Sequence, residues 1–292
     1  MVNLTYNKDR LHLPTAAELP HSDETSVDNQ LQNDIPNLLL GLLAELWANR
    51  DDWYFGVDMG IYYNPDEAAI VPDGFLAVGV KHDTGERGRL SYVLWEEENI
   101  VPILSLEVIS EKYNREYEDK LVGYQTLGIL YYAIYNPFSG RRGRFKNRQR
   151  LEVYKLIGGK YELFRSQDNR VWLPEIELAL GYEYGEHIAW YREWLYWYDG
   201  SGNRYLTTKE KAINAIAIAN QERLIAAQER RGKEEAEAIA HQERVIAAQE
   251  RREKEDAEAI AHQERLAKEE AEQKAQRLAE RLRAMGINPD EI

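Results

Sequence analysis

Residues 100–137 read IVPILSLEVISEKYNREYEDKLVGYQTLGILYYAIYNP, and this stretch decides the fold. Residues 100–109 are almost entirely apolar, as expected of a central strand that is buried on both faces of a sheet. Residues 113–127 change to helical spacing, and Gly128 stands where a helix C-cap belongs. Residues 129–135 are apolar again and end at Asn-Pro. The stretch therefore predicts a strand, a helix and a second strand.

The sequence on either side adds further elements. The segments expected before this unit are a helix at 37–48 with a broad apolar face and strand-like runs at 53–63 and 75–80. The segments expected after it are a hairpin at 151–164 around Gly158-Gly159 and two strands joined by a turn at 199–203. This order predicts an α/β (α+β) fold in which helices flank a mixed β-sheet.

The C-terminal part is a repeat. From Asn220 the sequence recurs every 21 residues, as NQERLIAAQERRGKEEAEAIA and then HQERVIAAQERREKEDAEAIA. Twenty-one residues are three heptads, so the repeat is compatible with a left-handed coiled coil. Its apolar seam consists of Ile225, Ile239, Ile246 and Ile260. Charged residues interrupt this seam, so a solitary solvated helix and a coiled coil that makes the protein a homo-oligomer both remain open.

Charge and composition restrict the class of protein. The 292 residues carry a formal net charge of −14, and residues 1–208 hold 21 basic against 32 acidic side chains. A domain this acidic is no general nucleic-acid binder, so any contact with DNA must be local. There is no Cys, and the longest apolar run near the start, residues 38–44, is too short to span a bilayer. We expect a soluble cytoplasmic protein with no membrane contact.

Three charged residues stand where the pattern favours apolar ones. Asp73 follows Pro72 at the start of a strand, and Glu107 lies inside the apolar run at 100–109. Lys120 falls on the inward stripe of the predicted helix. A buried carboxylate is unfavourable unless it meets a metal, a proton or a cation. Two carboxylates and a lysine suit metal-dependent phosphodiester chemistry, but the residues by themselves are more often explained by a structural ion pair.

These residues lie in a pattern that resembles a known family. The pattern runs from Val71-Pro72-Asp73 through PILSLEVIS at 102–110 to Lys120-x3-Tyr124-x3-Gly128 and YYAIYNP at 131–137. It resembles the Uma2 family of restriction endonucleases, also called DUF820, over roughly residues 37–210. The resemblance implies an irregular segment at 1–36, a PD-(D/E)xK nuclease-like domain at 37–208, a charged helix at 209–286 and a tail at 287–292.

The resemblance also implies roles for individual residues. Asp73 and Glu107 are expected to bind Mg²⁺ or Mn²⁺, and Glu45 on the first helix is expected to add a further acidic ligand unless it is merely solvated. Because Ile109 occupies the third place of a strict E-x-K motif, the catalytic lysine is expected to be Lys120 from the helix. The second strand ends in Asn136-Pro137, where the family usually has Asp-Pro.

A basic loop follows this strand. Its charges could bind DNA phosphates, or they could simply be solvated; the candidates are Arg141, Arg142, Arg144, Lys146 and Arg148. Tyr and Trp crowd residues 182–206, where they could stack on bases but more commonly form core. Two functions follow from the sequence, namely a metal-dependent DNA endonuclease and a catalytically inactive nuclease fold that assembles partners through its C-terminal helix.

Overall fold

The computed structural model describes residues 12–20, 29–82, 85–111, 115–141, 143–164 and 168–286. The chain divides into two compact units, Met1–Lys211 and Ala212–Ile292, and each is described by itself. Among the described residues, no helix has both the length and the apolar character that a bilayer crossing requires.

A six-stranded mixed sheet forms the centre of the first unit. Its strands, in spatial order, are β1 (Trp53–Val57), β3 (Gly74–Val78), β5 (Leu104–Val108), β6 (Tyr131–Tyr135), β7 (Leu151–Ile157) and β8 (Lys160–Phe164). Only β5 and β6 run parallel to each other, and all other neighbours are antiparallel. The connection between the parallel pair contains α2 (Asp119–Leu127), as a parallel crossover requires. The predicted strand–helix–strand unit and the mixed sheet are thus confirmed.

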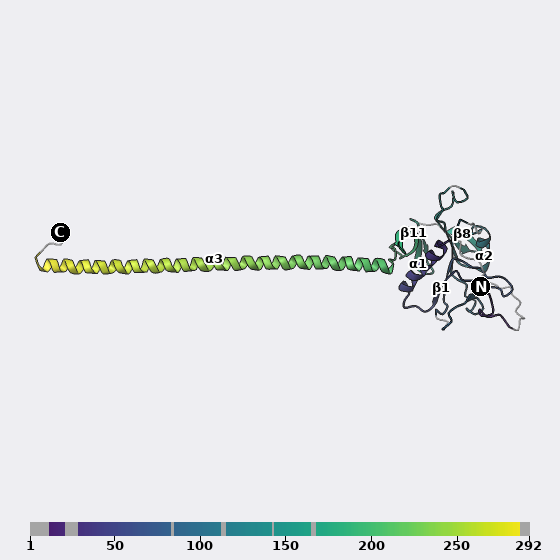
Figure 1. The fold of residues 1–292 in the computed structure, drawn as a ribbon, viewed down its shortest axis with the longest axis horizontal. Helices are drawn as coiled ribbons and strands as arrows, with labels where there is room; N and C mark the ends of the chain where they lie inside the picture. Colours follow the sequence, from purple (N-terminus) through teal and green to yellow (C-terminus); the bar gives the residue numbers. More distant parts are fainter. Residues whose placement is uncertain are drawn as a thin grey trace. The chain divides into compact units, whose positions relative to one another are not determined.

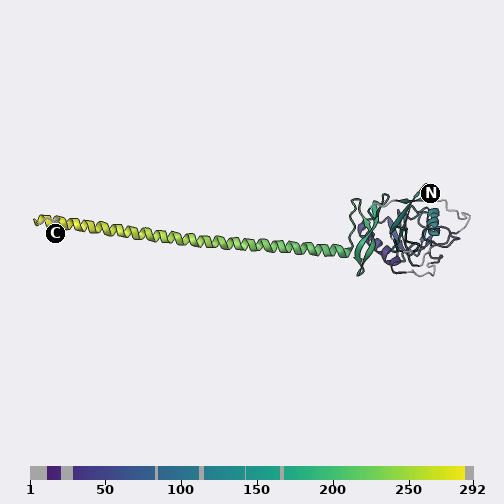
Figure 2. The same ribbon diagram turned by 90° about the horizontal axis from the view of Figure 1, so that it is seen from above.

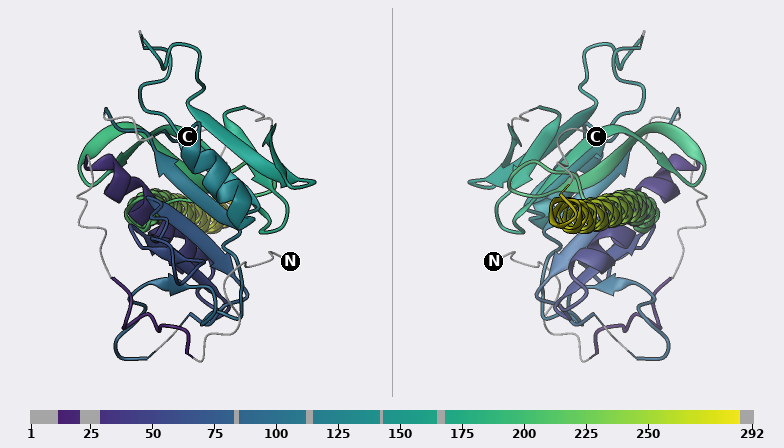
Figure 3. Two further views of the ribbon diagram at one scale, coloured as in Figure 1. Left: turned by 90° about the vertical axis from the view of Figure 1, so that its right-hand side faces the viewer. Right: turned by 90° about the vertical axis from the view of Figure 1, so that its left-hand side faces the viewer.

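Helices cover both faces of this sheet. One face packs against α1 (Leu31–Leu46), which buries an apolar stripe that includes Leu39 and Leu43. The other face is covered by α2 (Figure 3). Tyr124 and Leu127 of this helix belong to the apolar core on that face. Alternation along β5 accordingly sends Leu104, Leu106 and Val108 into the first core and leaves Ser105 and Glu107 on the α2 face.

A second sheet packs on the α1 side. It has three antiparallel strands, which are β9 (Arg170–Leu173), β10 (Leu178–His187) and β11 (Trp190–Tyr198). Figure 2 shows this second sheet, in green, beside α1. Trp194, Leu195 and Trp197 of β11 belong to the same apolar core as α1 and the six-stranded sheet. The indole of Trp197 also donates a hydrogen bond to the Leu39 carbonyl, at 3.1 Å. Most aromatic side chains of this region are therefore core, as their usual role suggests.

Three boundaries differ from the sequence-based expectation. The helix expected at 37–48 begins at Leu31, with Pro36 inside it, because burial of Ile35 outweighs the one hydrogen bond that proline removes. The strand expected at 53–63 ends at Val57, where Asp58 has a φ of +49°. The turn expected at 199–203 does form, but it leads only to a single bridge between Tyr198 and Arg204.

The hairpin of this region instead turns ten residues earlier. It turns at Ile188 and Ala189, which join β10 to β11 with φ angles of +45° and +60°. Neither residue is a usual choice for a left-handed turn, so the sequence carries no turn signal there.

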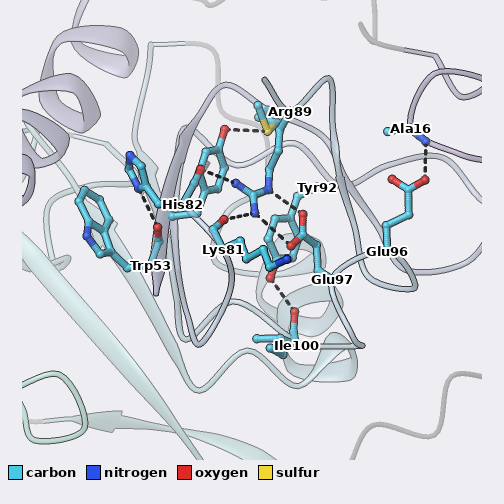
Figure 4. A network of polar contacts seen from close by, with 11 residues as sticks. Ala16, Trp53, Lys81, His82, Arg89, Tyr92, Glu96, Glu97 and Ile100 are labelled. Carbon is cyan, nitrogen blue, oxygen red and sulfur yellow. Dashed lines mark hydrogen bonds and ion pairs between the residues drawn. The ribbon is translucent and has the colours of Figure 1, made fainter. Parts of the chain in front are cut away.

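A buried ion pair organises the segment between β3 and β5 (Figure 4). Arg89, only 3% exposed, donates to Glu97 at 2.6 Å and stacks over the Tyr54 ring at 4.3 Å. Its guanidinium also donates to the carbonyls of Lys81 and His82. The short parallel strands β2 (Ile61–Tyr62) and β4 (Tyr92–Val93) lie beside this network. These contacts join the segment after β3 to the segment before β5 and to Tyr54 of β1.

The helix α3 (Thr208–Ala284) runs without a break for 77 residues (Figure 1). It begins with a capping box, in which the Thr207 amide and hydroxyl both donate to Glu210 Oε2 at 2.9 Å. Arg204 holds the same carboxylate at 2.7 Å, and these contacts lower the pKa of Glu210 to about 2 although burial opposes the shift. No residue of α3 is buried along its length.

Candidate functional site

The sheet topology brings the candidate residues to one edge. Because β3 is antiparallel to β5, the start of β3 lies beside the end of β5, with Gly74 opposite Leu106. Asp73 immediately precedes β3, and Glu107 is the penultimate residue of β5. The backbone N–H of Val108 donates to Asp73 Oδ2 at 2.6 Å, so Asp73 lies against the peptide that follows Glu107.

Helix α2 supplies two donors to Glu107. Lys120 Nζ donates to Glu107 Oε2 at 2.8 Å, and the Tyr124 hydroxyl donates to Oε1 at 2.6 Å. Lys120 and Tyr124 are four residues apart and thus occupy the same face of the helix. The structure therefore places Asp73, Glu107 and Lys120 together, as expected from charges that interrupt apolar patterns.

Burial makes the charges of this site interact strongly. Glu107 is 1% exposed, Asp73 is 9% exposed, and the Lys120 side chain keeps 27% of its surface. Burial, and then the negative charge of Glu107, raise the pKa of Asp73 well above its ordinary value. Burial by itself would lower the pKa of Lys120, but the Glu107 carboxylate outweighs it and raises that pKa. Burial and Glu107 also raise the pKa of Tyr124, so its hydroxyl remains a donor.

Glu45 lies elsewhere. Its carboxylate accepts hydrogen bonds from Thr208 and Lys211 near the start of α3. The residue of α1 that bonds to Asp73 is Gln32, which lies 13 residues before Glu45, or about 20 Å along the helix at 1.5 Å per residue. The structure therefore does not bring Glu45 to the acidic pair.

A divalent cation fits the remaining donor set. Mg²⁺ needs one or two protein carboxylates and retains several waters, so a pair of acidic residues suffices for it. Asp73 and Glu107 supply carboxylate oxygens from adjacent strands, and the positive charge that compensates them here is Lys120. Among the described residues, no group of three or more His, Cys, Asp and Glu side chains is arranged to hold a metal. Asp73 and Glu107 thus offer the one or two carboxylates that Mg²⁺ or Mn²⁺ requires, with water left to complete the coordination.

Three further polar residues surround the pair. Gln32 is buried beside Asp73, Ser105 is fully buried on the same face of β5 as Glu107, and Glu116 is 1% exposed with a charge that acts on Lys120. Sequence reasoning missed Gln32 and Glu116 as site neighbours. Gln32 precedes the helix expected at 37–48, and Glu116 is one of three acidic residues in the helical stretch at 113–127, so neither stands out as a charge in an apolar position.

The basic loop lies at the same edge as the acidic pair. Because β5 and β6 are parallel and Val108 is opposite Tyr135, the loop after β6 starts beside the end of β5. The Arg148 guanidinium stacks on the Tyr117 ring at 3.9 Å, and Asn136 Nδ2 donates to the Tyr117 hydroxyl at 3.3 Å. Tyr117 is three residues before Lys120, so these contacts connect the loop to the site.

The loop itself is built on a pair of aromatic rings. Phe138 and Phe145 stack with centroids 5.9 Å apart, and Arg141 and Arg144 lie over them. Lys146, the residue after Phe145, is exposed. Arg142, the remaining predicted contact, lies outside the described residues. Arg141 and Arg144 are thus positioned by the stacked Phe138 and Phe145 rings.

This fold and this site define the class: a mixed α/β protein with an acidic pair and a lysine at the end of its central parallel strands. The chain belongs to the Uma2 family, whose model, described as "Putative restriction endonuclease", matches residues 23–185. That range includes Asp73, Glu107, Lys120 and the whole basic loop.

One solved structure is also similar to this chain. It is the crystal structure of a putative nuclease belonging to DUF820 from Anabaena variabilis, with a TM-score of 0.36 and 12% sequence identity. The match covers 50% of this chain and 74% of that one. A TM-score this low does not support a comparison element by element. No curated protein matches the chain.

Proposed function

We propose that this protein is a metal-dependent endonuclease that hydrolyses phosphodiester bonds of DNA. The observation that carries the proposal is the buried Asp73–Glu107 pair, with Lys120 bonded to Glu107 at 2.8 Å. Two buried carboxylates repel each other, and a protein that uses them only for its fold gains nothing from the second charge. Membership in a family named for restriction endonucleases supports the same reaction class.

Each residue has a role in the proposed reaction. Asp73 and Glu107 bind the cation, and Tyr124 orients the Glu107 carboxylate. A bound Mg²⁺ or Mn²⁺ lowers the pKa of its water and neutralises charge on the phosphate. Lys120, whose side chain is partly exposed, orients the attacking water or stabilises a phosphate oxygen as charge develops. The basic loop beside Tyr117 supplies the local phosphate contact that an acidic domain requires.

Thermal melting tests the metal site without requiring cleavage. We expect millimolar Mg²⁺ or Mn²⁺ to raise the melting temperature of the wild type, because a ligand bound only to the folded state stabilises it. The gain is about 2.7 kcal/mol when the free cation is at 100 times its Kd. Glu107→Gln is expected to show no shift.

The control variant is Glu45→Gln. Glu45 is bonded to Lys211 and does not reach the pair, so this variant is expected to keep the full metal-induced shift. An equal shift in Glu107→Gln and the wild type contradicts the assigned ligands. Loss of the shift in Glu45→Gln returns Glu45 to the ligand set. A nuclease assay on several DNA forms with each metal then tests the reaction itself.

The alternative function is an inactive nuclease fold that serves as a scaffold, and α3 supports it. The apolar side chains of the repeat are exposed, with Ile225 at 48%, Ile239 at 61%, Ile246 at 51% and Ile260 at 60%. A helix normally gains its stability by burying such a face. We therefore propose, for either function, that α3 pairs with α3 of a second copy through this isoleucine seam.

Light scattering tests the proposed pairing. The full chain is expected to be a dimer or larger, and a chain ending at Lys211, which retains the contacts of the first unit, is expected to be a folded monomer. Ile239→Glu with Ile246→Glu places charge in the seam and should give a monomer that is still helical by circular dichroism. A full chain that is monomeric at all concentrations refutes the pairing and leaves the helix itself unaffected.

A further inference from the structure

Two tyrosine rings on the β10–β11 hairpin are exposed, unlike most aromatic residues of this region. Tyr184 is 62% exposed and Tyr191 is 70% exposed. Their rings stack with centroids 5.8 Å apart and an interplanar angle of 29°. By contrast, Trp194, Tyr196 and Trp197 of the same hairpin are fully buried. The fold therefore does not need these two rings for its core.

The tyrosine pair adjoins the basic loop. Tyr184 is directly opposite Glu193 in the hairpin, so the two side chains lie on the same face of the sheet. Glu193 Oε2 accepts from Arg150 at 3.1 Å, and the Tyr135 hydroxyl donates to the Glu193 carbonyl at 3.2 Å. Arg150 ends the basic loop and also donates to the Pro137 carbonyl at 2.6 Å. The hairpin is thus tied to both ends of the loop.

A cavity of about 510 Å³ lies between the loop and the hairpin. Its polar lining comes from both sides, namely Ser139, Gln149 and Arg150 of the loop and Asn169, Tyr182 and Glu193 of the second sheet. Donors and acceptors of this kind suit the edges of bases or sugars better than an apolar ligand.

The charges around the tyrosines permit a polyanion to approach. The acidic residues of the hairpin are each held in an ion pair: Glu183 with Arg204, Glu186 with Lys209 and Glu193 with Arg150. The loop beyond them presents Arg141 and Lys146, both exposed. A strongly acidic domain therefore offers, at this one surface, neutralised carboxylates and exposed cations.

We propose that Tyr184, Tyr191 and the basic loop bind an unpaired DNA strand and direct it to the Asp73–Glu107 pair. The proposal rests on the proposed endonuclease function and names the form of its substrate. Aromatic rings stack on the faces of bases, and in a duplex these faces are hidden by neighbouring base pairs. The phosphates of the same strand follow the loop cations to Arg148, which stacks on Tyr117, three residues before Lys120.

Binding of full-length protein to labelled oligonucleotides tests this proposal. A dT oligonucleotide of about 20 nucleotides and a duplex of equal length are compared by fluorescence anisotropy in EDTA, where cleavage is absent. We expect the single strand to bind more tightly than the duplex. Tyr184→Ala and Tyr191→Ala should each weaken single-strand binding about tenfold, because each removes one stacked base. Tyr184→Phe retains the ring and should bind like the wild type.

The matched control is Trp172→Ala. Trp172 is 39% exposed on β9 and pairs with Ala179, so it lies on the opposite face of the same sheet from Tyr184. It should not change single-strand binding. Duplex preferred over single strand, RNA preferred over DNA, or unchanged binding by both tyrosine variants overturns the proposal. Tyrosine-dependent binding by a wild type that cuts nothing supports the binding surface and refutes only the nuclease.

Discussion

Replacing Lys120 by alanine is expected to reduce DNA cleavage by about 10²- to 10³-fold, the usual loss when one group that stabilises transition-state charge is removed. Lys120 is the cation of the acidic pair, and its side chain is the most exposed of the three, so it can reach a bound phosphate. Its contribution is made mainly in the transition state, so the rate should fall without a matching rise in the Kd for DNA.

The stability of the same variant distinguishes catalysis from a structural ion pair. Without metal, Glu107 loses the donor Lys120 and, among the described residues, keeps the Tyr124 hydroxyl, so the melting temperature should fall. With Mg²⁺ present the cation neutralises Glu107, and we expect the melting temperature to return close to that of the wild type. A purely structural lysine instead leaves a buried charge unpaired under every condition, at a loss of roughly 3–5 kcal/mol.

Lys120→Arg serves as the companion variant. Arginine keeps the charge but replaces a mobile ammonium by a wide planar group, so it should restore the metal-free stability and little of the cleavage. If Lys120→Ala cleaves DNA at the wild-type rate, Lys120 has no catalytic role. If the wild type cuts neither DNA nor RNA with any metal, and Lys120→Ala unfolds readily even with Mg²⁺, the scaffold function replaces the nuclease.

The central part of the fold follows from the sequence because local signals and burial agree there. The apolar run that contains β5, the helical spacing before Gly128 and the Gly158-Gly159 turn each favour one structure, and Gly128 does adopt a left-handed φ of +84°. The hairpin at Ile188-Ala189 could not be predicted, because residues without turn preference are held there by the packing of Trp194 and Trp197. Tertiary contacts outweigh local preference at that point.

The site was predictable to the extent that its charges interrupt apolar patterns. Asp73, Glu107 and Lys120 each do so, and the structure brings them together. Glu45 does not interrupt an apolar pattern on its helix, and it bonds to Lys211 instead of reaching the acidic pair. Gln32 contacts Asp73 because of where it stands along α1, and its residue type gave no sign of this contact. The angle at which α1 crosses the sheet decides which of its turns lies beside the start of β3. This angle is set by packing between the helix and the sheet, so it cannot be predicted from the residues of α1 alone.

Replacing Asp73 by asparagine is expected to stabilise the metal-free protein while abolishing its response to Mg²⁺ and its cleavage. Burial and the charge of Glu107 raise the pKa of Asp73, so the folded state binds this proton more tightly than the unfolded chain. As the pH rises from the ordinary Asp value of about 3.9 through the raised value, ionisation of Asp73 therefore destabilises the fold. Asparagine has the same shape, carries no charge and can still accept from the Val108 N–H.

Melting curves from pH 4 to pH 8 in EDTA measure the effect. The two proteins should melt together at low pH, and Asp73→Asn should melt several degrees higher at pH 8, where 1 kcal/mol corresponds to about 2–4 °C for a domain of this size. With Mg²⁺ at pH 8 the order should reverse, because only the wild type retains both carboxylates. Asp51→Asn, at an exposed position, should leave the melting curve unchanged.

The sign of the metal-free difference is the decisive measurement. If a carboxylate stabilises the fold, replacing it lowers the melting temperature. If a carboxylate serves to bind a metal, its charge destabilises the metal-free fold, and replacing it raises the melting temperature until metal is added. Lower stability of Asp73→Asn at pH 8 in EDTA would therefore contradict the metal role of Asp73, even if cleavage were also lost. If Asp73→Asn is more stable than the wild type in EDTA and no longer responds to Mg²⁺, the Asp73 charge lowers the stability of the metal-free fold. Its role is then to bind the metal.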